Sequence, residues 1–213
     1  MSCPHCRGAE KVFDKGVASG DLDAYRAKGP SRQTRLLLEA IRHWGAEGRT
    51  LLDIGGGVGA IQHELLAVGA AAAVHVDAST AYLGASQEEA ARRGHRERVQ
   101  YVHGDFVEVA DGIAAADIVT LDRVVCCYPD MPALVGASSA RARQLYGLVY
   151  PRDGWWMRLA GKVFNLYFRV QRNPFRIFVH SSSAVDAVVR ANGLREIYRE
   201  RRGLWQVALY TRS

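Results

Sequence analysis

The sequence of 213 residues contains no apolar run that approaches the roughly 18 residues a helix needs to cross a bilayer. It also begins without the basic and then apolar pattern of a secretory signal. Cysteine is scarce, because the four residues form only Cys3-x-x-Cys6 and the adjacent pair Cys126 and Cys127, which is unlike a disulfide framework. Internal repeats, low-complexity tracts and linkers are also lacking. We therefore expect a cytoplasmic protein with free thiols.

Acidic residues are scarce in the last third of the chain. From Arg152 onward, 12 lysines and arginines stand against 4 aspartates and glutamates, whereas the whole chain has a net charge of +6. Such a bias can attract an anionic small molecule, a membrane surface or nucleic acid, or it can form a solvated basic face. Because no nucleic-acid-binding module is recognisable, we do not expect nucleic acid as a partner.

Short apolar segments alternate with helical patterns from residue 50 onward. The predicted strands are Thr50–Ile54, Ala72–Val76, Val99–Val102, Ile118–Leu121 and Leu145–Tyr150. The predicted helices are Ala60–Val68, Ser79–Arg93, Leu134–Gln144, Trp155–Arg172 and Ser183–Ala191. This alternation implies a parallel sheet with right-handed crossovers. The last two strands, Leu194–Tyr198 and Trp205–Thr211, are expected to pair antiparallel.

The first 48 residues show no strand-like alternation and predict a helical cap. One helix is expected to open near Asp21 and to break at Gly29-Pro30, and a second to run from an N-cap at Ser31 to Trp44. We therefore expect one domain in four parts: a cap over residues 1–48, a cofactor-binding core over 49–150, a substrate-covering insertion over 151–176, and a C-terminal helix and strand pair over 177–213.

A glycine-rich loop follows the first predicted strand and precedes a helix. Three glycines at alternate positions allow positive φ and a close approach of the backbone to a ligand, which would face the amides of the helix's first turn. Gly55-x-Gly57-x-x-Ala60 fits the dinucleotide fingerprint, and Asp77 lies at a suitable distance to bind a ribose. One interpretation is therefore an NAD(P)-dependent oxidoreductase.

The same loop contains the pattern Asp53-x-Gly55-x-Gly57-x-Gly59. This pattern resembles the signature of class I S-adenosylmethionine-dependent methyltransferases. Later segments strengthen this resemblance: Asp77 ends the second strand where that family binds ribose, and Gly104-Asp105-Phe106 resembles its adenine-binding turn. The resemblance implies S-adenosyl-L-methionine as the cofactor. It also implies a Rossmann-like α/β fold, with a mostly parallel seven-stranded sheet, helices on both faces and an antiparallel last strand. The cofactor-binding residues so implied are Asp53, Gly55, Gly57, Gly59, Asp77, Ala78, Asp105, Phe106, Leu121 and Asp122.

A looser resemblance concerns the acceptor. The segment Leu121–Pro129, with its Tyr-Pro ending, is similar to a motif of magnesium protoporphyrin O-methyltransferases, and Phe178-Val179-His180 and the final Trp-x-x-Ala-Leu-Tyr strand are similar to segments of small-molecule methyltransferases. The acceptor-side residues predicted from these segments are Tyr128, His180 and Arg123.

Methyl transfer is an in-line displacement at a sulfonium carbon, so the enzyme must chiefly align acceptor and methyl group. A carboxylic acid acceptor arrives ionised and needs no base, and its natural partner is an arginine such as Arg123, Arg152 or Arg176. We therefore predict O-methylation of an apolar or aromatic metabolite that can carry a carboxylate.

The predicted helix 155–172 and the four cysteines each allow a further hypothesis. The amphipathic, basic helix predicted over residues 155–172 can cover an apolar acceptor, pack in the core, or contact an anionic membrane surface. Cys3, Cys6, Cys126 and Cys127 would make a thiol or metalloid methyltransferase if the N-terminal cap brought them together. Adjacent cysteines suit one tetrahedral centre poorly, so we predict no metal site.

Overall fold

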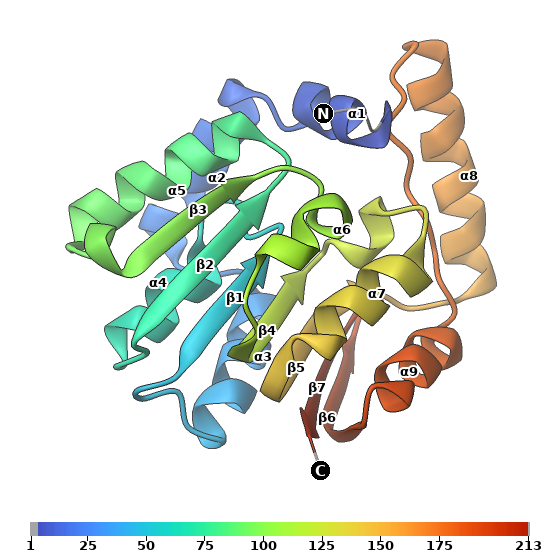
Figure 1. Cartoon of the computed structure of the whole chain (residues 1–213). Coiled ribbons are helices and arrows are strands. Elements are labelled where there is room, and N and C mark those ends of the chain that lie inside the picture. Colours follow the sequence, from blue (N-terminus) through green and yellow to red (C-terminus); the bar gives the residue numbers. More distant parts are fainter. Residues whose placement is uncertain (1–3, 213) are drawn as a thin grey trace.

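The computed structural model describes the backbone of residues 4–212 and the side chains of residues 7–212. Its centre is a seven-stranded sheet with the order β3-β2-β1-β4-β5-β7-β6 (Figure 1). The strands are β1 Thr50–Ile54, β2 Ala72–Asp77, β3 Val99–His103, β4 Ala116–Asp122, β5 Ala142–Pro151, β6 Leu194–Arg202 and β7 Trp205–Arg212. Strand β7 runs antiparallel to both neighbours, and the other pairs are parallel. The predicted α/β fold with its antiparallel last strand is therefore confirmed.

Helices cover both faces of the sheet (Figure 1). They are α1 Pro4–Val12, α2 Lys15–Lys28, α3 Arg32–His43, α4 Ala60–Ala67, α5 Thr80–Arg93, α6 Phe106–Val109, α7 Met131–Ala140, α8 Trp155–Val170 and α9 Ser182–Ala191. Side chains of α6, α7 and α9 share one core cluster with the sheet, and side chains of α3 and α4 share the other. The central strands β1 and β4 are buried on both faces, which explains their continuous apolar character.

Several predicted boundaries were wrong, among them the end of β6, which extends to Arg202 rather than to Tyr198. Helix α2 begins at Lys15 rather than near Asp21, because the Asp14 carboxylate caps it by accepting from the backbone N–H of Val17. Helix α7 ends at Ala140 rather than at Gln144, and β5 already begins at Ala142. The early start of β5 follows from pairing with β4, since Ala142 lies opposite Ala116. Tertiary pairing thus overrides the helical pattern of residues 141–144.

The carboxyl ends of the parallel strands meet at one edge of the sheet. Strand β1 lies between β2 and β4, so the residues that end these three strands are neighbours in space. Helix α1 lies above this edge, with α8 beside it at the side of the molecule (Figure 1). Within residues 4–212, none of the helices is both long enough and apolar enough to span a bilayer. Topology therefore gathers the predicted site at this edge.

Candidate active site

The loop from β1 to α4 adopts a backbone that glycine alone accommodates without strain. Gly55, Gly57 and Gly59 have φ values of 61°, 56° and 79°, in the left-handed region. A Cβ atom at Gly55 would lie 2.5 Å from Cγ2 of Val124, and one at Gly59 would lie 2.5 Å from Oγ of Ser86. The loop is therefore held tightly against its surroundings on one side, while its other side lines the cavity described below.

Asp53 is a buried carboxylate at the base of this loop, with only 1 % of its surface exposed. Its Oδ1 atom accepts a 2.7 Å hydrogen bond from Oγ1 of Thr120, whereas its Oδ2 atom has no hydrogen-bond partner among the described residues. Burial raises the pKa of Asp53 to about 7. A buried anionic oxygen without a donor is costly, so this atom is suited to a cationic or hydrogen-bonding ligand group.

Asp77 ties the end of β2 to the glycine loop. Its Oδ2 atom accepts from the backbone N–H of Gly57 at 3.0 Å, and its Oδ1 atom accepts from that of Ser79 at 2.8 Å. Burial raises the pKa of Asp77 to about 6, against the lowering effect of these two bonds. Its carboxylate thus bridges the loop and the start of α5 at the cavity wall.

Asp105, Tyr128 and His180 are connected by hydrogen bonds, although they follow different elements. The Tyr128 hydroxyl donates to both carboxylate oxygens of Asp105 at 3.0 Å, and Nε2 of His180 donates to the backbone carbonyl of Tyr128 at 2.9 Å. Asp105 also caps α6 by accepting from the backbone N–H of Val107. The interactions join the segments after β3, after β4 and before α9.

Asp122 and Arg123 end β4 at the same edge. Oδ2 of Asp122 accepts a 2.6 Å hydrogen bond from Oγ1 of Thr34 on α3, and Oδ1 accepts from Nε of Arg123 at 3.0 Å. Arg123 has a φ of 63°, which is uncommon for a residue with a side chain. Its backbone N–H donates to the carbonyl of Val149 at 2.8 Å, which holds this conformation. Strain of this kind is often found at functional sites.

These groups line one cavity of about 1010 Å³. Its polar part is formed by predicted site residues, namely Asp53, Gly55, Gly57, Asp77, Ala78, Asp105, Phe106, Asp122, Arg123 and Tyr128. Its apolar part is formed by α1, α8 and the segment before α9, and includes Val12, Phe13, Met157, Phe164, Phe168, Phe175 and Ile177. Three predicted residues, Gly59, Leu121 and His180, are not part of the lining. The volume is at the upper end of ligand pockets, which span roughly 300–1,000 Å³.

Several lining residues were missed by sequence reasoning. Lys28 of α2 and Arg35 of α3 bring two further cations to the cavity, and Tyr25 and Thr34 line it from the same helices. Phe13 lines the cavity next to Phe175, and the centroids of their rings lie 5.6 Å apart. No local motif marks these residues, because their positions depend on how the N-terminal helices fold over the sheet edge.

The cysteines do not form a described metal site. Cys126 and Cys127 line the cavity with their Sγ atoms 3.7 Å apart, and both are free thiols. The hydrogen bond with the Cys127 thiol, together with burial, raises the pKa of Cys126, which keeps this thiol protonated. Cys3 and the side chain of Cys6 lie outside the described residues. Among side chains 7–212, no group of three or more metal-binding residues gathers.

Comparison with known proteins agrees with this geometry. Residues 52–142 match a family model described as a methyltransferase domain. The fold is similar to that of magnesium protoporphyrin IX methyltransferase from Synechocystis, with bound S-adenosylhomocysteine, at a TM-score of 0.71 and 16% identity over 96% of this chain and 98% of that chain. An O-methyltransferase family protein from Burkholderia thailandensis gives a TM-score of 0.70 and 17% identity over 95% and 61% of the two chains. No curated protein matches the sequence significantly.

Residues 52–142 therefore match a methyltransferase domain, and the fold of the chain is that of class I S-adenosylmethionine-dependent methyltransferases. The NAD(P) interpretation is not supported. Dinucleotide-binding sheets typically have the order 3-2-1-4-5-6, whereas here the antiparallel β7 is inserted between β5 and β6.

Proposed function

We propose that the enzyme transfers a methyl group to an oxygen of an apolar or aromatic small molecule that carries a carboxylate. One observation carries this proposal: a single cavity joins the polar edge of the sheet to an apolar wall of α8, Phe175, Ile177 and Val179, with Arg123 in its lining. A structural neighbour from Planctomyces limnophilus, an O-methyltransferase family 2 protein at 16% identity and a TM-score of 0.61 over 87% of this chain and 63% of that chain, was solved with apigenin.

The polar part of the cavity fits S-adenosylmethionine, which would supply an activated sulfonium methyl group. A Cβ at Gly55 or Gly56 would clash with neighbouring side chains, so the backbone itself forms that wall. We assign Asp77 to the ribose hydroxyls, and Asp105 with Phe106 to the adenine. The loop amides suit the polar methionine end, as does the Oδ2 atom of Asp53, which has no hydrogen-bond partner among side chains 7–212. The remaining predicted cofactor residues, Ala78 and Asp122, line the same part.

Of the three arginines predicted to hold an acceptor carboxylate, Arg123 is the best placed. It lines the cavity, and its side chain is 47% exposed, with Asp122 as its ion-pair partner. Arg152 instead donates to the carbonyl of Gly203, and Arg176 donates to backbone carbonyls of its own segment. Neither of these two lines the cavity. A bidentate pair with Arg123 would orient an ionised acceptor that needs no base.

Tyr128 and His180 are then positioning residues. The Tyr128 hydroxyl holds the Asp105 carboxylate, and His180 holds the backbone of Tyr128. The apolar wall from α1 and α8 excludes water, so alignment of acceptor and methyl group supplies the rate.

A mass-spectrometric screen tests this function. The enzyme is incubated with S-adenosylmethionine bearing a deuterated methyl group and with aromatic carboxylic acids, the matching neutral amides, and thiols. We expect labelled methyl esters, and a kcat/KM with the acids that falls at least about tenfold in Arg123→Gln, as loss of a charged hydrogen bond implies. Arg176→Gln is the matched control and should behave as wild type. Labelled amides or thioethers without esters would contradict the proposal.

A further inference from the structure

Helix α8 presents an apolar surface that no other described element covers. Gly161 is its only buried residue. One side of the helix forms an outer stripe with every side chain more than half exposed, consisting of Trp155 (77%), Leu159 (55%), Val163 (63%), Leu166 (62%) and Val170 (74%). These residues repeat every three or four positions, so they lie on one face. Exposed apolar patches of this kind mark interaction surfaces.

The opposite side of α8 belongs to the active-site cavity. Met157, Ala160 and Phe168 line it from the inner face of the helix. Trp156 and Phe164 line the cavity as well, yet they are 41% and 55% exposed. The cavity wall and the outer surface therefore meet on this helix, and whatever contacts the outer stripe also lies beside the cavity.

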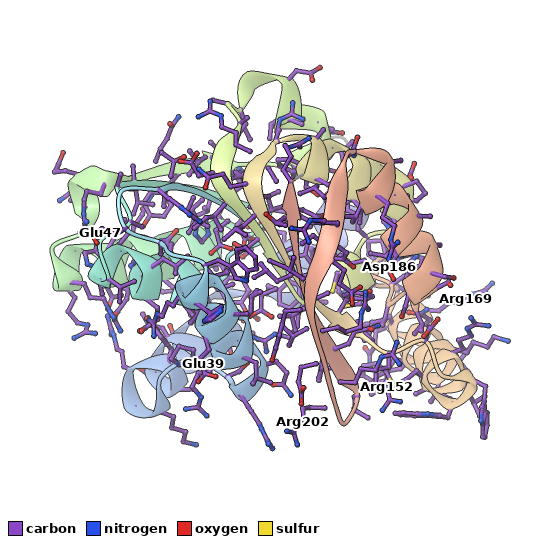
Figure 2. The ribbon with its side chains drawn as sticks, turned by 90° about the horizontal axis from the view of Figure 1, so that it is seen from below. Glu39, Glu47, Arg152, Arg169, Asp186 and Arg202 are labelled. Atoms are coloured by element: carbon purple, nitrogen blue, oxygen red, sulfur yellow. The ribbon has the colours of Figure 1, made fainter. Side chains whose placement is uncertain are left out.

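The charge around the outer stripe has a single sign. Between Asp153 and Asp186 the sequence contains no acidic residue, while it contains Arg158, Lys162, Arg169, Arg172 and Arg176. At 100° per residue, Arg158, Lys162 and Arg169 share one flank of α8 next to the outer stripe. None of these three takes part in an ion pair within residues 7–212. Figure 2 shows Arg169 at the outside of the molecule.

We propose that α8 docks on an anionic lipid bilayer, with the outer stripe in the boundary between headgroups and acyl chains and the basic flank against the headgroups. An apolar stripe beside a flank of one charge is the pattern of an interfacial amphipathic helix. A second copy of the chain is a poorer occupant, because it would bring two like-charged flanks together. Docking would also open the cavity toward acceptors dissolved in the bilayer, and this last step rests on the proposed function.

Vesicle co-sedimentation tests the docking without cofactor or acceptor. The full chain is mixed with vesicles of phosphatidylcholine, with or without phosphatidylglycerol, at low and high salt. Binding is expected only with phosphatidylglycerol, and it should weaken at high salt. The double variant Leu159→Ser/Leu166→Ser should lower the partition coefficient at least about tenfold. Arg158→Gln/Arg169→Gln should lower it on the order of tenfold.

Matched controls change apolar and basic residues that are exposed elsewhere. Val17→Ser/Val68→Ser and Arg32→Gln/Arg96→Gln should keep the partition coefficient within about twofold of wild type. Unchanged binding of S-adenosylhomocysteine verifies that each variant is folded. The proposal is overturned if wild type ignores anionic vesicles, if control and α8 variants lose binding equally, or if α8 variants instead convert a dimer to a monomer in light scattering. Failure of all acceptors in the screen above would overturn the proposed reaction and leave the vesicle result standing.

Discussion

Asp53 illustrates how a single residue can be costly to the fold and useful to the site. Its carboxylate lies in the core of the sheet with one oxygen bonded to Thr120 and the other without a partner among the described residues. Two neighbouring imidazoles are also buried, and burial lowers the pKa of His63 to about 4 and that of His75 to about 3. As pH rises, the titration of Asp53 lowers the free energy of unfolding, whereas the titrations of His63 and His75 raise it. A variant at Asp53 is therefore needed to separate the two effects.

Asp53→Asn isolates the contribution of the carboxylate. Burial raises the pKa of folded Asp53 to about 7, whereas an unfolded aspartate titrates near about 4. Between these values the folded state binds more protons, so the stability of wild type falls relative to Asp53→Asn as pH rises through that window. From pH 5 to pH 8 we expect the difference in unfolding free energy to change by about 2 to 3 kcal/mol. Urea denaturation without ligand measures it, and a difference independent of pH would refute the burial effect.

At the scale of single residues, the sequence predicted which acidic residues lie near strand ends, and the structure brings them to one cavity. Asp77 and Asp122 each end a short apolar strand, and Asp53 lies one residue before the end of another. Parallel pairing brings such ends together. It could not predict Lys28 or Arg35, because neither lies in a motif and only the packing of α2 and α3 brings them to the cavity. Nor could it predict that Tyr128 donates to Asp105, since 23 residues separate them in the chain.

At the scale of elements, the glycine loop allows the cost of an added methyl group to be compared at two of its positions. Gly57 and Gly59 both have positive φ, but a Cβ at Gly57 would meet only Tyr82 at 3.9 Å, whereas at Gly59 it would lie 2.5 Å from Oγ of Ser86. Gly57→Ala should therefore cost about 1 to 2 kcal/mol for backbone strain alone, and Gly59→Ala about 1 to 3 kcal/mol more for overpacking. Thermal unfolding measures the loss of stability in each variant. An equal loss in both, or a larger loss in Gly57→Ala, would contradict the predicted clash at Gly59.

A second comparison concerns the antiparallel pair β6–β7 and α9. The Arg199 guanidinium, whose side chain is only 13% exposed, donates to Asp186 at 2.7 Å and to Gln206 at 2.9 Å, and it also bonds Glu196 and Tyr210. Arg199→Ala removes the only cation that pairs with Asp186 and Glu196 among residues 7–212, and it should cost about 3 to 5 kcal/mol.

The matched control is Arg202→Ala on the same strand. Arg202 is 55% exposed and pairs with Glu200 at the surface, so its removal should cost no more than about 1 kcal/mol. Chemical denaturation compares the two variants. A loss of equal size in both would show that the network around Arg199 does not anchor α9 to the sheet.

Elements were easier to predict than their ends. Ser31 caps α3 through its hydroxyl, and Gly94 ends α5 in a left-handed conformation that glycine adopts without strain, as the sequence indicates. The border between α7 and β5 was wrong because residues 141–144 suit a helix locally, while pairing with β4 decides their conformation. The apolar face of α8 was predicted, but its exposure was not, because periodicity does not reveal what covers a face.

For the whole molecule, the N-terminal helices, α8 and the sheet edge enclose one cavity, so ligand and fold should stabilise each other. A ligand that binds only the folded state at about 100 times its Kd adds about 2.7 kcal/mol to the unfolding free energy. We therefore expect S-adenosylhomocysteine to raise the thermal midpoint by roughly 5 to 10 °C for a chain of this size. NADH at the same concentration should leave the midpoint unchanged, and a comparable rise with NADH would contradict the site.

Calorimetric titration of S-adenosylhomocysteine into wild type, Asp77→Asn and Asp23→Asn tests the proposed cofactor site most directly. Asp77 lines the cavity, whereas Asp23 is exposed on α2 and does not. We predict that wild type and Asp23→Asn bind with equal affinity and that Asp77→Asn binds at least about tenfold more weakly, as loss of charged hydrogen bonds to a ribose implies. Undiminished binding by Asp77→Asn would contradict the assignment of the cavity to the cofactor.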